Sequence, residues 1–366
     1  MLFFSGGSAL RRASRCLTRF THRSRHLITP FDSGGSSAKL RDAFGMLSVG
    51  DLRNRMMALA DEGAPGGEAV QRLFARRLPE GAAPAELALA LARLTGVDAP
   101  DLHELPPALA GPIGAHLREV AAAMPAAFDL RGASVGNLVL VGAFLRHERR
   151  IDAAIEEVAR LLGVRGHVQA VVADDLHLVA ELVDGSWVAA QHRITDPAGA
   201  GRRPPIARVM LSRSKERLEP ASATIDAGTA AAIADAELIC FPIGSFFTSV
   251  IACLLPRGVG AAVARSGAPK VFVPNLGEDP ELCGVGLRAQ VEALLAALRA
   301  DAGEVPAARL LDLVLVDRGL AGRVGAAEIT GIRGLGVRVL EVPLAMPGSA
   351  PLVDGERLVA ALLSLV

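Results

Sequence analysis

Short apolar runs alternate with segments of helical period through most of the chain. The runs span four to seven residues and contain β-branched or aromatic side chains, at 2–5 (LFFS), 26–29 (HLIT), 237–241 (ELICF), 269–274 (PKVFVP), 311–317 (LDLVLVD) and 337–343 (VRVLEVP). Residues 11–19 and 285–300 instead carry apolar side chains at helical spacing. This alternation predicts an α/β fold, with a doubly wound, Rossmann-like parallel sheet covered by helices on both faces.

Three stretches depart from this rhythm. Residues 62–129 are rich in Ala, Leu and Pro and hold two runs of helical period, which predicts a helical insertion into a core made of 1–61 and 130–366. Within 164–195, the pair Asp184-Gly185 separates two strand-like runs and indicates a β-hairpin, which we expect at a sheet edge. The stretch 196–221 is rich in Pro, Gly and Arg and predicts a long loop.

Composition narrows the class of protein. With 366 residues, half of them apolar, the chain forms two domains or one large domain with an insertion. Its formal net charge of zero argues against nucleic acid as a main partner. The apolar runs are too short to cross a bilayer, so we expect a soluble, cytoplasmic protein without a membrane partner. Cys16, Cys240, Cys253 and Cys283 lack metal-site spacing and are interpreted as buried thiols.

The N-terminal segment has two interpretations. Six arginines and no acidic residue precede Asp32, as in a mitochondrial transit peptide. The same residues also fit a strand, a Gly-Gly turn and a helix, followed by a second strand that leads into a second glycine loop. We favour the folded interpretation, because a cleaved leader has no need of that second loop.

Three Gly/Ser loops each follow a predicted strand, at 5–10 (SGGSAL), 31–37 (FDSGGSS) and 242–249 (PIGSFFTS). Free N–H groups at glycine turns bind anions, and in a doubly wound sheet all three loops lie at the edge where ligands bind. Each loop alone is also explained by tight packing, and the second by a flexible linker. Together they predict a phosphate or nucleotide site formed by Gly6, Gly7, Ser8, Ser33, Gly34, Gly35, Ser36, Ser37, Gly244, Ser245, Thr248 and Ser249.

Neither a GxGxxG fingerprint nor a P-loop is present, which excludes an ordinary dinucleotide dehydrogenase and a P-loop NTPase. Polar side chains near the loops extend the candidate site. Asp32 suits Mg²⁺ or a ligand hydroxyl, with an N-cap as the alternative. Asp51, Asn54 and Asn137 stand near the starts of predicted helices, where contact with a ligand and helix capping both remain open.

The motifs, in their order along the chain, resemble those of the CofD/YvcK superfamily. This superfamily contains the 2-phospho-L-lactate transferases and the YvcK-type proteins of bacterial cell-envelope and carbon regulation. The resemblance covers nearly the whole chain and rests on SGGSAL, TPFDSGGSSAKLR, GDLRN, VGNL, LVAELVDG, GSFFTS and APKVFVPN. The sequence looks closest to the CofD-related branch of the multi-gene GAK system.

The resemblance implies a nucleotide or nucleotide-sugar ligand, with Asn275 added to the binding residues. It implies Asp32 as the catalytic residue and Mg²⁺ ligand, and partner proteins from the same multi-gene system. We also expect a homodimer.

Two departures from the family pattern affect the predicted activity. The family's paired aspartates become Asp32-Ser33, and a glycine of the third loop becomes Ile243. We can also point to no signature of the transferases' deazaflavin pocket.

One hypothesis is an enzyme that transfers a phosphate-linked group from a nucleotide-activated donor. The other is a non-catalytic regulator that binds a nucleotide sugar, which needs the loops but no carboxylate pair. The residue at position 33 favours the regulator, whereas the family as a whole favours the enzyme. A scaffold whose loops are purely structural is the third alternative.

Overall fold

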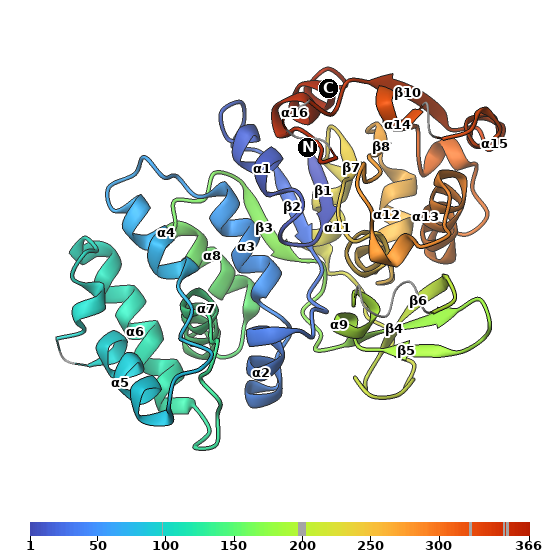
Figure 1. The fold of residues 1–366 in the computed structure, drawn as a ribbon. Helices are drawn as coiled ribbons and strands as arrows, with labels where there is room; N and C mark the ends of the chain where they lie inside the picture. Colours follow the sequence, from blue (N-terminus) through green and yellow to red (C-terminus); the bar gives the residue numbers. More distant parts are fainter. Residues whose placement is uncertain (97, 197–202, 322–323, 347, 349–350) are drawn as a thin grey trace.

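A seven-stranded parallel sheet forms the centre of the computed structural model, which describes residues 1–366 except 97, 197–202, 322–323, 347 and 349–350 (Figure 1). The strand order is β10-β9-β8-β7-β1-β2-β3, and every neighbouring pair is parallel. The doubly wound prediction is therefore confirmed. The strands are β1 (Leu2–Ser5), β2 (Arg25–Ile28), β3 (His167–Ala170), β7 (Ile239–Phe241), β8 (Lys270–Phe272), β9 (Leu313–Asp317) and β10 (Arg338–Val342).

The strand order reverses between β1 and β7. From β1 the chain adds β2 and β3 on one side, and it later returns to place β7 to β10 on the other side. Connections that leave two adjacent parallel strands in opposite directions open a crevice at the carboxyl ends of those strands. The loops after β1, β2 and β7 therefore meet at one edge of the sheet.

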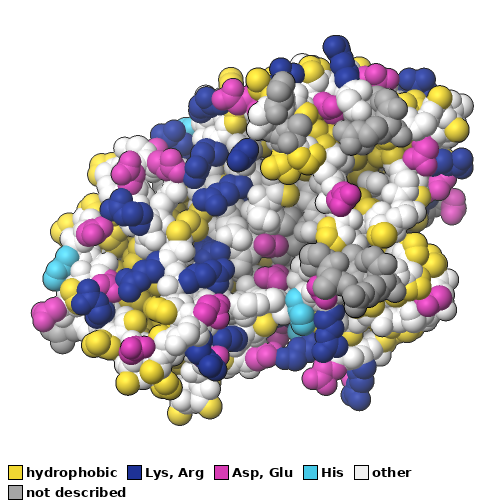
Figure 2. All heavy atoms as spheres, viewed as in Figure 1, with side chains coloured by type: hydrophobic (Ala, Val, Ile, Leu, Met, Phe, Trp, Pro, Cys, Tyr) yellow, Lys and Arg dark blue, Asp and Glu magenta, His cyan; other side chains and the backbone are white. Residues whose placement is uncertain are grey.

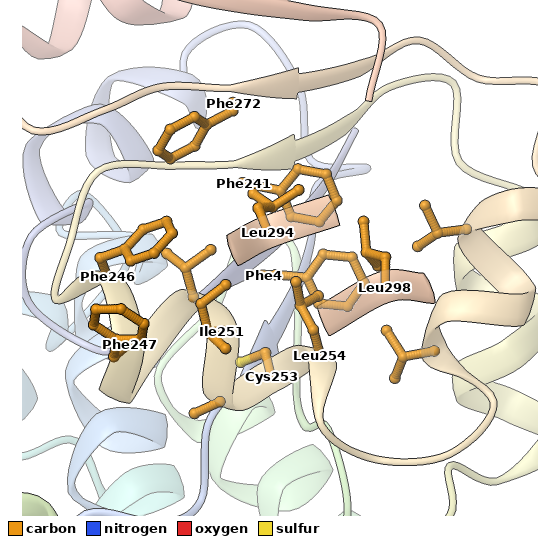
Figure 3. Packing of buried hydrophobic residues seen from close by; sticks show 14 of the residues in the cluster. Phe4, Phe241, Phe246, Phe247, Ile251, Cys253, Leu254, Phe272, Leu294 and Leu298 are labelled. Carbon is orange, nitrogen blue, oxygen red and sulfur yellow. The ribbon is translucent and has the colours of Figure 1, made fainter. Parts of the chain in front are cut away.

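Side chains on alternate positions of each strand enter two different cores. Phe3 and Cys240 face α1 (Arg11–Leu17) and α16 (Gly355–Leu363). Phe4 and Phe241 stack with ring centres 5.5 Å apart on the opposite face, beneath α13 (Leu287–Ala302), as Figure 3 shows. The same face is covered by α11 (Ala227–Ala234), α12 (Val259–Arg265), η2 (Phe246–Val250) and η3 (Ile251–Leu254).

A third core belongs to the helices beyond β3. It joins α2 (Gly35–Phe44), α3 (Gly50–Leu59), α7 (Val135–Arg146) and α8 (Ile151–Leu161) with the helices of residues 62–129. Those helices are α4 (Gly67–Ala75), α5 (Pro84–Thr95), η1 (Pro100–Leu102) and α6 (Pro107–Ala123). The helical stretch thus shares one core with its neighbours, and the domain boundaries at 61 and 130 stay a prediction.

A separate antiparallel sheet has the order β5-β4-β6, with β4 (His177–Leu182), β5 (Trp187–Ala189) and β6 (Ile206–Ser212). The hairpin turn at Asp184-Gly185 is present, and Gly185 adopts a φ of 82°. The hairpin lies outside the main sheet, however, and the run at 167–170 is the parallel edge strand β3. The predicted loop 196–221 is also wrong in part, since it contains β6. Proline and arginine beside that strand hid its short alternating pattern, and residues 197–202 lie outside the described part.

The remaining elements are α9 (Gln191–Ile194), η4 (Pro280–Leu282), η5 (Ala307–Arg309), α14 (Arg318–Ala321) and α15 (Ala326–Gly334). The arginine-rich N-terminal segment supplies a central strand and its covering helix, β1 and α1. Three of the four cysteines are buried as predicted, but Cys283 is exposed, because it lies in the surface turn after η4. Within the described ranges, no helix has the length and apolar character needed to cross a membrane.

Candidate functional site

A small cavity lies at the point where the strand order reverses. Its volume is about 180 Å³, and its walls come from the loops after β1 and β7, with Asp32, Asp51, Gln191 and Ser249. Figure 2 shows Asp and Glu side chains near the middle of this face, with Lys and Arg gathered on one side of them. The loop residues that line the cavity are Gly6, Gly7, Ser8, Ala9, Leu10, Ile243, Gly244 and Ser245.

The loop after β1 packs closely against α3. A Cβ atom on Gly7 would lie 2.5 Å from Asp51 Oδ1 and 2.7 Å from Asp51 Cα, so only glycine lets the helix approach. Tight packing therefore explains Gly7 by itself. The N–H groups of Ser8 and Ala9 have no protein acceptor among the residues described, and both residues line the cavity. This loop thus offers free donors to an anion.

Two carboxylates from different elements face the same cavity. Asp32 accepts a hydrogen bond from the Gly34 N–H at 2.9 Å through Oδ1. Asp51 lies in the first turn of α3. Neither is the N-cap residue that capping would require, since Gly34 precedes α2 and Val49 precedes α3. Asp51 of α3 thus places a second carboxylate on the wall of the cavity that Asp32 lines.

Asp51 has an unusually high pKa. Burial, reinforced by the negative charge of Asp32, raises the pKa of Asp51 to about 7. The nearby Arg55 guanidinium and a hydrogen bond from the Gly7 N–H act in the opposite direction but do not cancel this rise. Near neutral pH, Asp51 can therefore hold or release a proton, and a bound cation would favour its ionised form.

The side chains of Ser36 and Ser37 in the second loop are buried within the protein. Ser36 Oγ accepts from the Ser134 N–H at 3.1 Å and ties α2 to α7. Ser37 lies against Gly50 at the start of α3. Gly35 is different, because its φ is 49° and no atom approaches the position of a Cβ within 4 Å. As the first residue of α2, it presents an N–H without an acceptor in the helix.

Ser33 connects the second loop to the antiparallel sheet. Its Oγ lies 3.0 Å from His192 Nδ1 and accepts from the His192 N–H at 3.2 Å. His192 and Gln191 belong to α9, directly after β5. The sequence analysis missed both residues, because no motif surrounds them and their partners lie far away along the chain.

In the third loop, N–H groups that were expected to bind a ligand donate hydrogen bonds to other residues of the protein. The Gly244 N–H donates to Asn275 Oδ1 at 2.9 Å, and Asn275 Nδ2 donates back to the Gly244 carbonyl at 2.7 Å. The Phe246 N–H donates to Asp279 Oδ2 at 3.0 Å. Asn275 therefore braces this loop, while Ser245 and Ser249 stay on the cavity wall.

Glu281 accepts the next hydrogen bonds from the third loop. Its Oε2 accepts from the N–H groups of Phe247 and Thr248 at 2.7 and 2.9 Å, and its Oε1 accepts from the Thr248 hydroxyl. Burial, together with the charge of Asp279, raises the pKa of Glu281 to about 7. Of the third-loop residues that the sequence analysis assigned to a ligand, Thr248 thus has its N–H and hydroxyl donors held by a protein carboxylate.

We expect Glu281→Ala to destabilise the protein by about 3 kcal/mol, because it leaves three donors buried and unpaired. Urea unfolding at pH 7.5 measures this loss. Glu278→Ala, which removes an exposed carboxylate three residues earlier, is the matched control and should change stability by less than about 0.5 kcal/mol. Equal stabilities of the two variants would show that Glu281 does not cap the helical segment.

Two predicted asparagines do not line the cavity. Asn54 Oδ1 accepts from Arg53 Nη2 at 2.6 Å. Asn137 is buried in the first turn of α7, which is capped by Ser134, and its Oδ1 has no partner among the described residues. The cavity thus brings together Asp32, Asp51 and parts of the first and third loops. Ser33, Gly34, Gly35, Ser36, Ser37, Asn54, Asn137, Thr248 and Asn275 lie outside its walls.

A larger cavity of about 480 Å³ continues from the first and shares Ser8, Ala9, Ile243, Gly244 and Ser245 with it. It extends between the start of α1 and residues 275–280, and Arg11 and Arg12 line one side. The two cavities form one cleft, with carboxylates at the inner end and arginines at the outer end.

A metal ion at the inner end would have few protein ligands. Asp32 and Asp51 both line the small cavity, but the described part of the chain holds no group of three His, Cys, Asp or Glu side chains arranged to bind a metal. Mg²⁺ is commonly held by one or two carboxylates together with substrate phosphates. The pair is therefore sufficient for Mg²⁺ only when a phosphate ligand completes the site.

Comparisons with known proteins find similarities that cover most of the chain. The family model described as 2-phospho-L-lactate transferase CofD matches residues 1–330. A Deinococcus radiodurans protein with the provisional name gluconeogenesis factor is 29% identical over 368 residues, which cover 98% of this chain and 64% of that protein. The gluconeogenesis factor of Bacillus subtilis is 28% identical over 277 residues, 76% of this chain and 68% of that protein. The chain thus spans about two thirds of the length of these relatives.

A crystal structure from Bacillus halodurans, described as a member of the UPF0052 family, has the same fold. Its TM-score is 0.71 at 22% identity, over 99% of this chain and 97% of the other.

Proposed function

This chain belongs to the 2-phospho-L-lactate transferase CofD family, and we propose that it binds a nucleoside diphosphate compound, such as a nucleotide sugar, in the cleft between β1 and β7. The convergence of the glycine loops after β1 and β7 at the reversal of strand order carries this proposal. Open α/β sheets bind ligands at this position, and free backbone N–H groups there suit phosphate oxygens.

The diphosphate would lie along the loop after β1. Ser8 and Ala9 have N–H groups free to donate, whereas the N–H groups of Phe246, Phe247 and Thr248 are held by Asp279 and Glu281. The larger cavity beyond this loop would take the nucleoside, because it is roomier and lined by both polar and apolar side chains. Arg11 and Arg12 would balance the phosphate charge from the rim.

Asp32 and Asp51 would hold Mg²⁺ against the diphosphate. Both carboxylates line the inner cavity, and phosphate oxygens would supply the missing ligands. When bound, the ion would neutralise charge on the phosphates.

The experiment that tests this proposal is a panel of nucleoside diphosphates and nucleotide sugars in a thermal-unfolding assay, in phosphate-free buffer with Mg²⁺. At a hundredfold excess over its dissociation constant, a true ligand should stabilise the folded protein by about 2.7 kcal/mol. Absence of any shift across all bases and sugars would contradict the proposal.

Asp32→Asn should weaken binding of such a ligand about tenfold or more in the presence of Mg²⁺, since a hard cation prefers an anionic oxygen. Folding should hold, because asparagine can still accept the hydrogen bond from the Gly34 N–H. Calorimetric titration of wild type and variant, with and without Mg²⁺, measures the effect. Equal affinities in all four titrations would leave Asp32 with a structural role alone.

A regulator that binds without turnover fits the chain best. Ser33 replaces the second aspartate of the family pattern and is engaged with His192, so the loop itself offers one carboxylate. The gluconeogenesis factors among the relatives are consistent with this role. The homodimer and the partner proteins of a multi-gene system stay predictions.

Group transfer is a second candidate, favoured by the raised pKa of Asp51 beside Asp32. In such a reaction Asp51, free of the metal, would take the proton of an acceptor hydroxyl, whose oxygen would then bond to the phosphorus of the phosphate-linked group. The nucleoside monophosphate would leave with the electron pair of the broken P–O bond. Acceptor-dependent release of nucleoside monophosphate, lost in Asp51→Asn, would support this activity, and binding without release would leave the regulator.

A further inference from the structure

A short helix outside the main sheet supplies part of the wall of the inner cavity. α9 follows β5 and lies beside β4 and β5 of the antiparallel sheet (Figure 1). Its first residue, Gln191, lines the cavity together with Asp32 and Asp51. In the described part of the chain, the hydrogen bonds of Gln191 involve only its backbone carbonyl, which accepts from the N–H and the hydroxyl of Thr195. The side-chain amide of Gln191 is therefore free to bind a ligand.

The position of α9 is fixed by contacts with the second glycine loop and with the core. The His192 N–H donates to Ser33 Oγ at 3.2 Å, and His192 Nδ1 lies 3.0 Å from the same oxygen. Ser33 directly follows Asp32, so this contact joins α9 to the loop that carries the carboxylate. The Ile194 side chain is completely buried in the core. These contacts hold Gln191 in a defined place relative to Asp32.

The backbone that leads into α9 is strained. Ala190 has a φ of 74° and a ψ of 131°, a conformation that residues other than glycine rarely adopt. The surrounding structure holds Ala190 there, because its side chain is buried and its N–H donates to the Leu178 carbonyl of β4 at 2.9 Å. Strain of this kind is concentrated at functional sites. Here it turns the chain after β5 so that Gln191 lies on the cavity wall.

The place of Gln191 along the cleft indicates which part of a ligand it meets. Ser8 and Ala9, whose N–H groups are assigned to the diphosphate, line both cavities, whereas Gln191 lines only the inner one. With the nucleoside in the larger cavity, a group attached to the distal phosphate reaches the inner end. A carboxamide both donates and accepts hydrogen bonds and carries no charge. It therefore suits a hydroxyl group better than a further phosphate.

We propose that Gln191 is a specificity-determining residue, which forms a hydrogen bond to a hydroxyl of a sugar attached to the distal phosphate of the nucleotide. A ligand that carries this sugar is thereby distinguished from the bare nucleoside diphosphate by a contact from α9, outside the glycine loops. The inference rests on the proposed function, because it requires the diphosphate to lie along the loop after β1.

The test is calorimetric titration of uridine and guanosine diphosphates, and of uridine diphosphate glucose and guanosine diphosphate mannose, into wild type, Gln191→Met and Arg193→Ala with Mg²⁺ present. Methionine keeps the length of the half-buried side chain and removes its amide. Arg193 is the matched control, since it is an exposed residue of the same helix and lines neither cavity. In Gln191→Met, affinity for at least one sugar derivative should fall about three- to tenfold, while affinity for its parent diphosphate stays within about twofold of wild type. Gln191→Asn, which withdraws the amide by one methylene group, is a second variant and should change the ratio of the two affinities in the same direction.

Several outcomes would overturn this inference while leaving the proposed function intact. An equal fall for a diphosphate and its sugar derivative would place Gln191 against a phosphate. An unchanged ratio of affinities in Gln191→Met, or the same change of ratio in Arg193→Ala, would remove Gln191 from sugar recognition. Wild-type protein that binds a diphosphate and no sugar derivative would show that the inner end takes no sugar. Absence of binding by every nucleotide would instead contradict the proposed function, and this inference with it.

Discussion

Gly7→Ala is expected to lower affinity for a nucleoside diphosphate by roughly ten- to a hundredfold and to destabilise the protein by about 1–3 kcal/mol. A methyl group at this position would lie 2.5 Å from Asp51 Oδ1, 2.7 Å from Asp51 Cα and 2.9 Å from Asn54 Cβ. Because a backbone atom is among these, the clash cannot be relieved by a change of rotamer. Either α3 or the loop must move, and both carry groups assigned to the ligand.

Gly267→Ala is the matched control, since Gly267 is exposed and no atom lies within 4 Å of a Cβ placed there. It should leave affinity unchanged and stability within about 0.5 kcal/mol. Calorimetric titration and urea unfolding of both variants measure the two effects. Undiminished affinity in Gly7→Ala would show that the loop after β1 does not bind the diphosphate.

Asp51→Asn is expected to stabilise the ligand-free protein at pH 8 while weakening ligand binding. The folded-state pKa of Asp51 is raised from 3.8 to about 7 by burial and by Asp32. Ionisation is therefore easier in the unfolded chain, so above pH 7 the charged side chain costs the folded state free energy. One pKa unit corresponds to about 1.4 kcal/mol, and we expect a gain of roughly 2 kcal/mol for asparagine at pH 8 after relaxation of the site.

The gain in unfolding free energy from Asp51→Asn should shrink as the pH falls from 7 towards 4. Over this range Asp51 of the wild type is protonated in the folded state, and it also becomes protonated in the unfolded state as the pH approaches 4. Urea unfolding at several pH values, with chelator present, measures it. Asp235→Asn, at the exposed C-terminal end of α11, is the control and should show no comparable pH-dependent gain. A variant at position 51 that is less stable than wild type at pH 8 would show that the carboxylate supports the fold instead of a ligand.

The centre of the parallel sheet was predictable because its strands there are short, buried and separated by helical periods. Leu2, Phe4, Ile239 and Phe241 are all completely buried, as continuous apolar runs indicate. The strand β6 was not predictable in the same way, since two of its seven residues are exposed, another is half-buried, and proline precedes the strand. Its pairing with β4 depends on residues about thirty positions apart, which local patterns do not reveal.

The position of the candidate site could be predicted from the sequence, but most of its contacts could not. Glycine loops after strands locate the sheet edge, and the strand order then brings two of them to one cavity. Spacing gives no indication that Glu281 caps Thr248, that Ser33 contacts His192, or that Asp51 stands beside Asp32. Each of these contacts joins elements that only the tertiary fold brings together.

A crystal structure of the protein with a bound nucleoside diphosphate and Mn²⁺ tests the central claim most directly, because the anomalous signal of manganese locates the metal. We predict diphosphate density along residues 6–9, in the cleft between β1 and β7, with the metal coordinated by Asp32 and Asp51. Density for the nucleotide at another surface, with the cleft filled only by water, would contradict the proposed site.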